Sequence, residues 1–394
     1  MSRFLLVVPP LVGHINPLVG VAAELRRRGH QVAWAGHTGQ IRALAGEGSA
    51  VYDCQVPEVS RPPDLTGPAA FRLLWRDVFL PLARRMAPGV RAALHAFEPD
   101  LVVADQHALA GALVAEASGV PWVTTVSTSA ELADPLAGMP KVAAWLAELL
   151  AGLRAEIGDP AATGDPRFSP YGSVAFTGRE LLGGQPLPAP GIELVGPVVA
   201  DRPERSDFPW HRLPADRPLV LVSLGTANVD AGDRFLREAL AALGAAGDRL
   251  AGVLVDPAGT LADTTPPRHV LVLPRVPQLA LLPRMSAVVC HGGHNTVCES
   301  LWHGVPLVVA PIRDDQPIVA GQVVAAGAGV RVRFGRVTAA GLDAALATVL
   351  DPANGHRAAA RAAARSLRAA GGAGAAADLL TRVAAGRLPT PTPH

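Results

Sequence analysis

Residues 291–300 form the segment of this sequence best suited to binding an anion. They read His-Gly-Gly-His-Asn-Thr-Val-Cys-Glu-Ser and directly follow a short apolar run at residues 287–290. Glycines at a strand-to-helix turn let backbone N–H groups approach a phosphate, and the helix N-terminus adds partial positive charge. His291 can donate a further hydrogen bond, and Glu299, two turns into the helix, could reach ribose hydroxyls. The segment predicts a diphosphate cradle; the alternative is a tight turn with a surface glutamate.

Two further segments follow apolar runs and carry groups that suit a nucleotide sugar. Ser223 and Thr226 lie on either side of a Leu-Gly pair, where small hydroxyl side chains could contact the same diphosphate. Asp315 and Gln316 stand side by side, and a carboxylate next to an amide offers acceptors and donors to sugar hydroxyls. An ordinary turn is the alternative for the first segment, and a helix N-cap is the alternative for Asp315.

The first half of the chain offers a candidate general base. His14 follows an apolar run at residues 4–8, and Asp105 ends a second run at residues 101–104. If both runs are parallel strands, both side chains lie at carboxyl ends of the same sheet. A His–Asp pair there forms a general base whose tautomer the aspartate fixes. A structural histidine and a helix-capping aspartate are the alternatives.

Other nucleotide and metal chemistries lack their sequence signatures. The sequence has neither GxGxxG after an expected strand nor GxxxxGK[ST], which argues against dinucleotide dehydrogenases and P-loop proteins. It has no Asp-x-Asp pair to clamp a diphosphate through a metal. His291, His294 and His303 could be metal ligands, but no cysteine pair or HExxH helix completes a set. We therefore expect no metal site and no cofactor besides the donor substrate.

Short β-rich runs alternate with longer helical patterns, which predicts the elements that position these groups. Apolar runs that are each followed by a helix indicate parallel sheets covered on both faces, hence an α/β protein. The expected strands are residues 4–8, 32–35, 101–104, 122–125, 219–223, 250–255, 270–273, 287–290, 307–310 and 330–333. Helices are expected from Pro17, Asp233, Gln278, Asn295, Gln316 and Thr338, and an amphipathic helical pattern covers residues 353–387.

The pattern divides into two similar domains. Residues 201–218 concentrate charge and proline and interrupt every periodic pattern, as an interdomain linker does. We expect an N-terminal domain at residues 1–200, a C-terminal domain at 219–375, and a terminal helix and tail at 376–394. Two doubly wound parallel-sheet domains facing each other would bind ligands in a cleft between the carboxyl ends of their sheets.

Composition excludes several classes of function. The 394 residues include 35 Lys plus Arg and 34 Asp plus Glu, so the net charge of +1 gives no basic field for nucleic acid. A hydrophobic content of 49% with 18% charged residues excludes disorder as the dominant state. Three cysteines without CxxC spacing fit a reducing compartment. No apolar stretch is long enough for a membrane helix. We expect a cytoplasmic monomer or homodimer.

These motifs resemble those of the nucleotide-sugar-dependent family-1 glycosyltransferases of the GT-B fold, especially bacterial macrolide and natural-product enzymes. The match runs from Val276-Pro277-Gln278 through residues 291–300 and Gly304-Val305-Pro306 to Asp315-Gln316, with Gly13 to Pro17 in the first half. It covers nearly the whole length. The resemblance implies two Rossmann-like domains, of which the N-terminal one binds the acceptor and the C-terminal one binds the nucleotide sugar.

The resemblance also implies residue roles. His14 resembles the base that deprotonates an acceptor hydroxyl, and Asp105 the carboxylate that orients it. His291 resembles the diphosphate-binding histidine, and Glu299 the ribose-binding acid. The remaining donor contacts implied are Gly13, Ser223, Thr226, Val276, Gln278, Gly293, Asn295 and Thr296, with Asp315 and Gln316 as the sugar-binding pair. Arg275 stands where many relatives have a tryptophan stacked on the base; arginine can also stack, which leaves the choice of nucleobase open.

The expected reaction is a single inverting displacement at the anomeric carbon. UDP-glucose is the favoured donor, a dTDP-deoxysugar the alternative, and the acceptor is an apolar or aromatic small molecule. Transfer to carbon or nitrogen, an epimerase or hydrolase on the same fold, and a catalytically silent helper protein are the rival functions. A silent protein should have lost His14, Asp105 or Glu299, and all three remain. Five apolar residues could face the acceptor but suit the core better: Phe71, Trp75, Phe79, Leu132 and Trp145.

Overall fold

The computed structural model describes residues 1–57, 67–133, 136, 138–199, 207–225 and 232–386. Contacts divide the chain into two compact units. Unit 1 comprises residues 1–177, 185–202 and 370–394, and unit 2 comprises residues 178–184 and 203–369. Among the helices that the structure describes, none is both long enough and apolar enough to cross a lipid bilayer.

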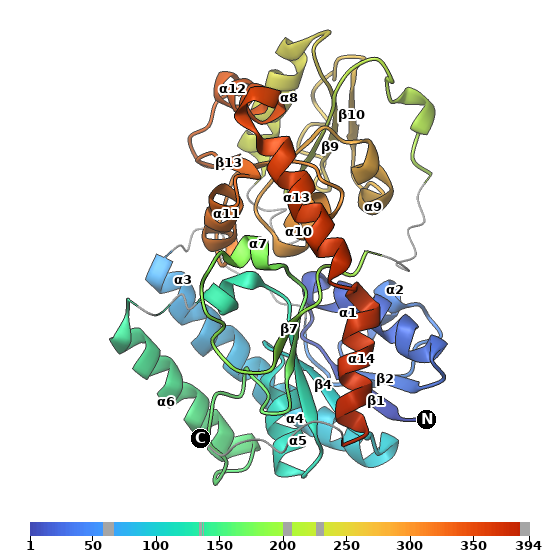
Figure 1. The fold of residues 1–394 in the computed structure, drawn as a ribbon, viewed down its shortest axis with the longest axis vertical. Helices are drawn as coiled ribbons and strands as arrows, with labels where there is room; N and C mark the ends of the chain where they lie inside the picture. Colours follow the sequence, from blue (N-terminus) through green and yellow to red (C-terminus); the bar gives the residue numbers. More distant parts are fainter. Residues whose placement is uncertain (58–66, 134–135, 137, 200–206, 226–231, 387–394) are drawn as a thin grey trace. The chain divides into compact units, whose positions relative to one another are not determined.

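The described part of unit 1 contains one parallel sheet of seven strands in the order β3-β2-β1-β4-β5-β6-β7 (Figure 1). Because strand order reverses at β1 and β4, helices are distributed over both faces, as in doubly wound folds. The strands are β1 (Arg3–Val7), β2 (Gln31–Gly36), β3 (Val51–Asp53), β4 (Leu101–Asp105), β5 (Trp122–Val126), β6 (Ser173–Ala175) and β7 (Ile192–Leu194).

Both faces of this sheet are buried, which is why its strands read as continuous apolar runs. Leu5 and Val7 of β1 face one apolar cluster, and Phe4 and Leu6 face another on the opposite side. The covering helical segments are α1 (Val12–Arg27), α2 (Thr38–Ala45), α3 (Gly67–Leu73), the π-helical η1 (Leu74–Phe79), α4 (Leu80–Phe97), α5 (Leu109–Ala117), η2 (Ser129–Ala133), α6 (Pro140–Ile157) and α14 (Gly372–Ala384).

The C-terminal helical pattern is broken into two helices that belong to different units. Gly371 adopts a left-handed conformation (φ 90°) between α13 (His356–Ala369) and α14. Helix α14 packs beside α1 (Figure 1), and Arg28 at the end of α1 pairs with Asp378 at 2.5 Å. The predicted C-terminal domain at residues 219–375 therefore differs from the contact division, because residues 370–375 and the helix after them complete unit 1.

Unit 2 repeats the architecture with six described parallel strands in the order β10-β9-β8-β11-β12-β13. All six were expected, to within one or two residues at each end. They are β8 (Leu219–Ser223), β9 (Ala251–Val255), β10 (Val270–Leu273), β11 (Ala287–Cys290), β12 (Leu307–Val309) and β13 (Gly329–Arg331). The prediction of an α/β protein with two parallel-sheet domains is confirmed.

Helices of unit 2 begin close to the expected residues. The segments are α7 (Arg179–Leu182), η3 (Trp210–Arg212), α8 (Asp233–Ala246), α9 (Gln278–Leu281), η4 (Leu282–Arg284), α10 (His294–Trp302), α11 (Gln316–Ala325), α12 (Ala339–Leu350), η5 (Pro352–Asn354) and α13. Part of the predicted linker at 201–218 lies outside the described residues. Its described part packs against unit 2, because Phe208 is buried in the same cluster as Leu219 and Leu221.

Candidate active site

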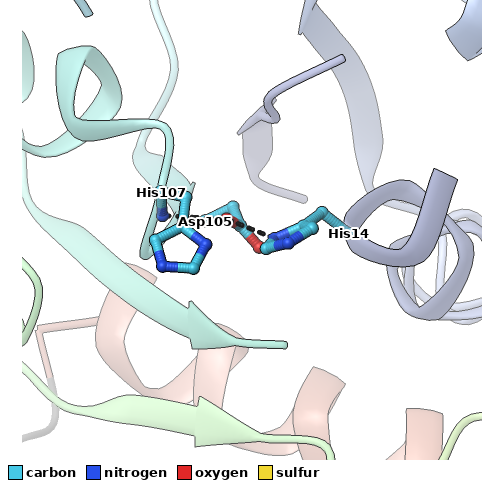
Figure 2. Close-up of side chains that lie close together, drawn as sticks. All are labelled: His14, Asp105 and His107. Atoms are coloured by element: carbon cyan, nitrogen blue, oxygen red, sulfur yellow. Dashed lines mark hydrogen bonds and ion pairs between the residues drawn. The ribbon is translucent and has the colours of Figure 1, made fainter. Parts of the chain in front are cut away.

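The carboxyl edge of the first sheet brings His14 and Asp105 together. Strands β1 and β4 are neighbours with Val7 opposite Ala104, so the residues that follow both strands emerge at one edge. His14 lies in the first turn of α1, which begins at Val12 rather than at the expected Pro17. Its Nδ1 lies 2.8 Å from Oδ1 of Asp105 (Figure 2). An Nδ1–H donated to the carboxylate leaves the lone pair on Nε2, the tautomer that a general base needs.

Two further donors hold the Asp105 carboxylate. The hydroxyl of Ser127 donates to Oδ2 at 2.5 Å, and the backbone N–H of His107 donates to Oδ1 at 2.9 Å. Burial alone raises the pKa of the Asp105 carboxyl, but the adjacent His14 ring and the hydrogen bonds outweigh it, so the net pKa is lowered. The carboxylate is therefore ionised near neutrality. Helix α5 begins later, at Leu109, so Asp105 does not cap it.

His107 is a residue of this site that the sequence reasoning missed. Its buried ring stacks on Phe79 with centroids 4.3 Å apart and meets Trp75 edge-on. Its Nε2 lies 3.8 Å from Glu131, which pairs with Arg167 at 2.7 Å. Burial raises the pKa of Glu131, but His107 and Arg167 outweigh that effect and lower it. The available signal was a histidine two residues after an aspartate at a strand end.

The second sheet positions His291 between two glycines. A Cβ on Gly225 would lie 2.7 Å from Cε1 of His291, and a Cβ on Gly293 would lie 2.4 Å from its Nε2. Neither position tolerates a side chain without moving the ring. Burial, with a smaller contribution from nearby Arg313, lowers the pKa of His291 to about 4, so the ring is neutral at pH 7. Helix α10 begins directly after Gly293, so its first N–H groups lie beside this ring.

The expected ribose-binding residue lies in a polar cluster of unit 2. Glu299 is buried, and the side-chain amide of Gln278 donates to its Oε2 at 2.7 Å. The same amide lies 3.5 Å from the Thr296 hydroxyl. The structure thus brings together three residues that the sequence analysis assigned to the donor nucleotide. Their binding roles stay predictions.

The expected sugar-binding pair begins helix α11. Oε1 of Gln316 accepts backbone N–H groups of Ile312 and Arg313 at 2.8 and 3.0 Å, which fixes the loop and leaves the amide NH2 as a donor. Asp315 occupies the N-cap position, but its side chain makes no capping hydrogen bond. The helix-cap alternative for this carboxylate is therefore not realised. Arg313 is buried beside His291 and is a second residue that the sequence analysis missed.

The remaining residues predicted to contact the donor differ in how far they are buried. Ser223 is buried at the end of β8, Val276 and Asn295 are half-buried, and Gly13 and Arg275 are exposed. Thr226 lies outside the described residues. Of the histidines considered as metal ligands, His294 contacts Cys298 at 3.3 Å and His303 follows the end of α10. In the described part of the chain, His291, His294 and His303 form no three-ligand cluster.

Comparisons with known proteins decide the family. Residues 192–359 match the family described as UDP-glucoronosyl and UDP-glucosyl transferase. The 4'-demethylrebeccamycin synthase of Lentzea aerocolonigenes is 30% identical over 89% of this chain and 92% of its own. The chain belongs to this glycosyltransferase family. The glycosyltransferase is also 30% identical, over 96% of both chains, to an uncharacterised UDP-glucosyltransferase, YojK, of Bacillus subtilis. The crystal structure of the glycosyltransferase of kitacinnamycin matches it with a TM-score of 0.77 and 29% identity over 98% of this chain and 99% of the other.

Aromatic contacts of the glycosyltransferase lead to the His14–Asp105 pair through His107. Trp75, Phe79 and Leu132 are fully buried and belong to the core, as expected. Phe71 and Trp145 are half-buried, with ring centroids 6.3 Å apart. The aromatic contacts run from Trp145 through Phe71, Trp75 and Phe79 to His107, whose ring lies 5.1 Å from that of His14.

Proposed function

We propose that this glycosyltransferase transfers a hexose, with inversion, from a nucleoside-diphosphate sugar to a hydroxyl of an apolar or aromatic natural product. The observation that carries the proposal is the pair of His14 and Asp105 at 2.8 Å. A buried carboxylate with three hydrogen-bond donors orients an imidazole whose other nitrogen is the base. Such an arrangement removes a proton from a hydroxyl that does not ionise by itself at neutral pH.

In the proposed reaction, Nε2 of His14 takes the proton of the acceptor hydroxyl. The acceptor oxygen then attacks the anomeric carbon as the bond to the nucleoside diphosphate breaks, which inverts the configuration in one step. His291, Arg313 and the first N–H groups of α10 stabilise the charge that develops on the leaving diphosphate. A general base contributes about 10²–10⁴ in rate, and electrostatic stabilisation of the leaving group adds to it.

We infer an apolar or aromatic acceptor from the aromatic contacts that lead to His107, whose ring lies 5.1 Å from that of His14. Phe71 and Trp145, at the far end of these contacts, are half-buried. Aromatic faces favour flat apolar ligands through stacking and burial of surface. The names of two similar proteins, the 4'-demethylrebeccamycin synthase and the glycosyltransferase of kitacinnamycin, refer to natural products, which agrees with such an acceptor.

We infer UDP-glucose as the donor from the groups expected to contact the sugar. Asp315 and the amide NH2 of Gln316 can together accept from and donate to neighbouring hydroxyls. A deoxysugar would leave one of these polar groups unpaired, at a cost of about 1–3 kcal/mol. A dTDP-deoxysugar stays the alternative, because the exposed Arg275 stands where the resemblance implies a stacking tryptophan, which leaves the choice between uracil and thymine open.

The test of the base is transfer to an aliphatic alcohol by His14→Ala. We expect the rate constant for transfer to fall by about 10²–10⁴, because no other base replaces the imidazole, while UDP binding changes little. The matched control is His95→Gln, which removes an exposed histidine of α4. With an acidic phenol, which ionises without help, the His14→Ala variant should keep most of its transfer activity. More than a tenth of the wild-type rate with the alcohol contradicts the assignment, and retained anomeric configuration contradicts the single displacement.

The test of the donor is Asp315→Ala, assayed with UDP-glucose and with its 4-deoxy analogue. We expect a larger loss of kcat/KM with glucose, since only that sugar offers the 4-hydroxyl to the carboxylate. Equal losses on the two donors would mean that Asp315 does not recognise the sugar.

A further inference from the structure

The ring of His107 carries a buried nitrogen with no hydrogen-bond partner among the described residues. The side chain is 9% exposed, and Nδ1 is shielded from solvent. Its Nε2 faces Glu131 at 3.8 Å, so Nδ1 is the nitrogen turned toward Asp105 and His14, as Figure 2 shows. Buried polar atoms are nearly always paired, so an orphan of this kind needs an explanation, and a bound ion is one.

The atoms around this nitrogen form a set of metal ligands. One ligand atom each from His14, Asp105 and His107 lies within 4.8 Å of the other two. Two imidazoles and a carboxylate suit first-row transition metals, Zn²⁺ in particular. We propose that His14, Asp105 and His107 form an inhibitory site for Zn²⁺ or a similar divalent transition metal, built around the catalytic base.

The surroundings of the three ligands fit a metal. Two are already held: the stack on Phe79 fixes the His107 ring, and Ser127 fixes the Asp105 carboxylate. The side chain of His14 is 15% exposed, more than those of the other two ligands, so an ion would enter from its side. A tetrahedral zinc site needs ligand atoms about 3.3 Å apart, so the longest separation, which is at most 4.8 Å, must shorten by up to about 1.5 Å.

The outer shell also resembles that of a metal site. Metal-bound histidines usually turn their second nitrogen toward a carboxylate, which raises the basicity of the coordinating one. Nε2 of His107 faces Glu131 in this way, and Arg167 fixes Glu131. A histidine placed only to fill the core would not need a half-buried carboxylate beyond its ring.

Metal binding at Nδ1 of His14 would stop the proposed reaction, so the inhibitory effect rests on the proposed function. The ion takes the nitrogen that now donates its proton to Asp105. That proton moves through solvent to Nε2, so the ring stays neutral overall. Nε2 then carries a hydrogen and has no lone pair for the acceptor proton. The metal thus locks the wrong tautomer of the base, and it does so without entering the diphosphate cradle of unit 2.

The direct test is a Zn²⁺ titration of the tag-free, full-length protein, without substrates, against a chromophoric chelator. We expect wild type to take up one equivalent. His107→Phe keeps a ring between Phe79 and Trp75. This variant and Asp105→Asn should each lower the affinity for Zn²⁺ by at least about 10–100-fold, the effect of losing an outer-shell partner. His95→Gln, which changes an exposed histidine on α4, should bind like wild type.

Three results would overturn the site: no uptake by wild type, equal affinity in wild type and both cluster variants, or the same loss in His95→Gln. Since the titration contains no substrate, its outcome does not depend on the proposed reaction. In a separate transfer assay, we expect Zn²⁺ to inhibit at the concentrations that saturate the site and EDTA to restore the rate. Saturation of the site with full activity would refute its inhibitory role.

Discussion

Replacing Gly293 by alanine tests whether the position of the His291 ring determines nucleotide affinity. The new Cβ would lie 2.4 Å from Nε2 of His291, about 1 Å inside ordinary contact distance. The ring has no room to retreat toward Gly225, because it already lies close to that glycine: a Cβ built there would be 2.7 Å from Cε1 of His291. It must therefore leave its place, and the hydrogen bond that it would donate to the diphosphate is lost.

The expected loss follows from the kind of hydrogen bond. A hydrogen bond to a charged group contributes about 1.5–3 kcal/mol, so its loss should raise the dissociation constant for UDP by roughly 10- to 100-fold. Isothermal titration calorimetry measures it. The matched control is Gly321→Ala in α11, where a Cβ meets nothing within 4 Å. UDP affinity in Gly293→Ala within twofold of wild type would refute the reasoning.

A second readout separates ring displacement from general damage. Burial lowers the pKa of His291 to about 4, so a ring pushed toward solvent should titrate closer to its ordinary value of 6.5. An NMR titration of the histidine ring signals, assigned with His291→Gln, measures this change. An unchanged pKa together with weakened binding would mean that the ring stays and that alanine acts on the backbone alone.

Three further outcomes are expected. Ser127→Ala should lower the free energy of unfolding by about 1.5–3 kcal/mol at pH 7, because the Asp105 carboxylate loses a hydrogen-bond donor. Since the folded-state pKa of Asp105 lies below its ordinary value of 3.8, the urea midpoints of variant and wild type, measured with EDTA, should converge only as the pH falls below that value. Ser169→Ala, which loses a bond to a neutral carbonyl, should show no such convergence. Between pH 4 and 6.5, UDP binding should be coupled to uptake of a proton, because a diphosphate raises the pKa of His291. Calorimetry in two buffers of different ionisation enthalpy measures this uptake; equal binding enthalpies in the two buffers would contradict it. Transfer activity should survive EDTA, and loss restored by Mg²⁺ would contradict a diphosphate held by His291 and α10.

The local sequence was sufficient to predict strands of at least four buried residues. β8 and β11 are continuous apolar runs, and the residues just beyond such runs lie at the carboxyl edge, which is how the contact of His14 with Asp105 could be anticipated. The strands β3, β6 and β7 were missed because each is three residues long and includes a polar or charged residue: Asp53, Ser173 or Glu193. The equally short β12 and β13 were found because the apolar run at 307–310 and the alternating pattern at 330–333 extend beyond them.

The contacts that complete each site depend on distant segments and escaped the sequence analysis. Ser127 reaches Asp105 from the end of β5, and Glu131 reaches His107 from η2. Arg313 lies beside His291 only because the loop after β12 is fixed by Gln316. None of these pairs has a characteristic spacing, because tertiary packing alone sets them.

The return of α14 to unit 1 fixes the order in which the protein can be assembled during synthesis. Ala376, Leu380 and Val383 are buried in the same apolar cluster as Phe4 and Leu18, although they are translated after unit 2. Until then, the emerging N-terminal half has an uncovered apolar face, and all of unit 2 is translated before that face is closed. Any exchange of halves between relatives must therefore transfer residues 370–386 together with the N-terminal part. A cut at the single central boundary would leave each chimera with a foreign helix over that face.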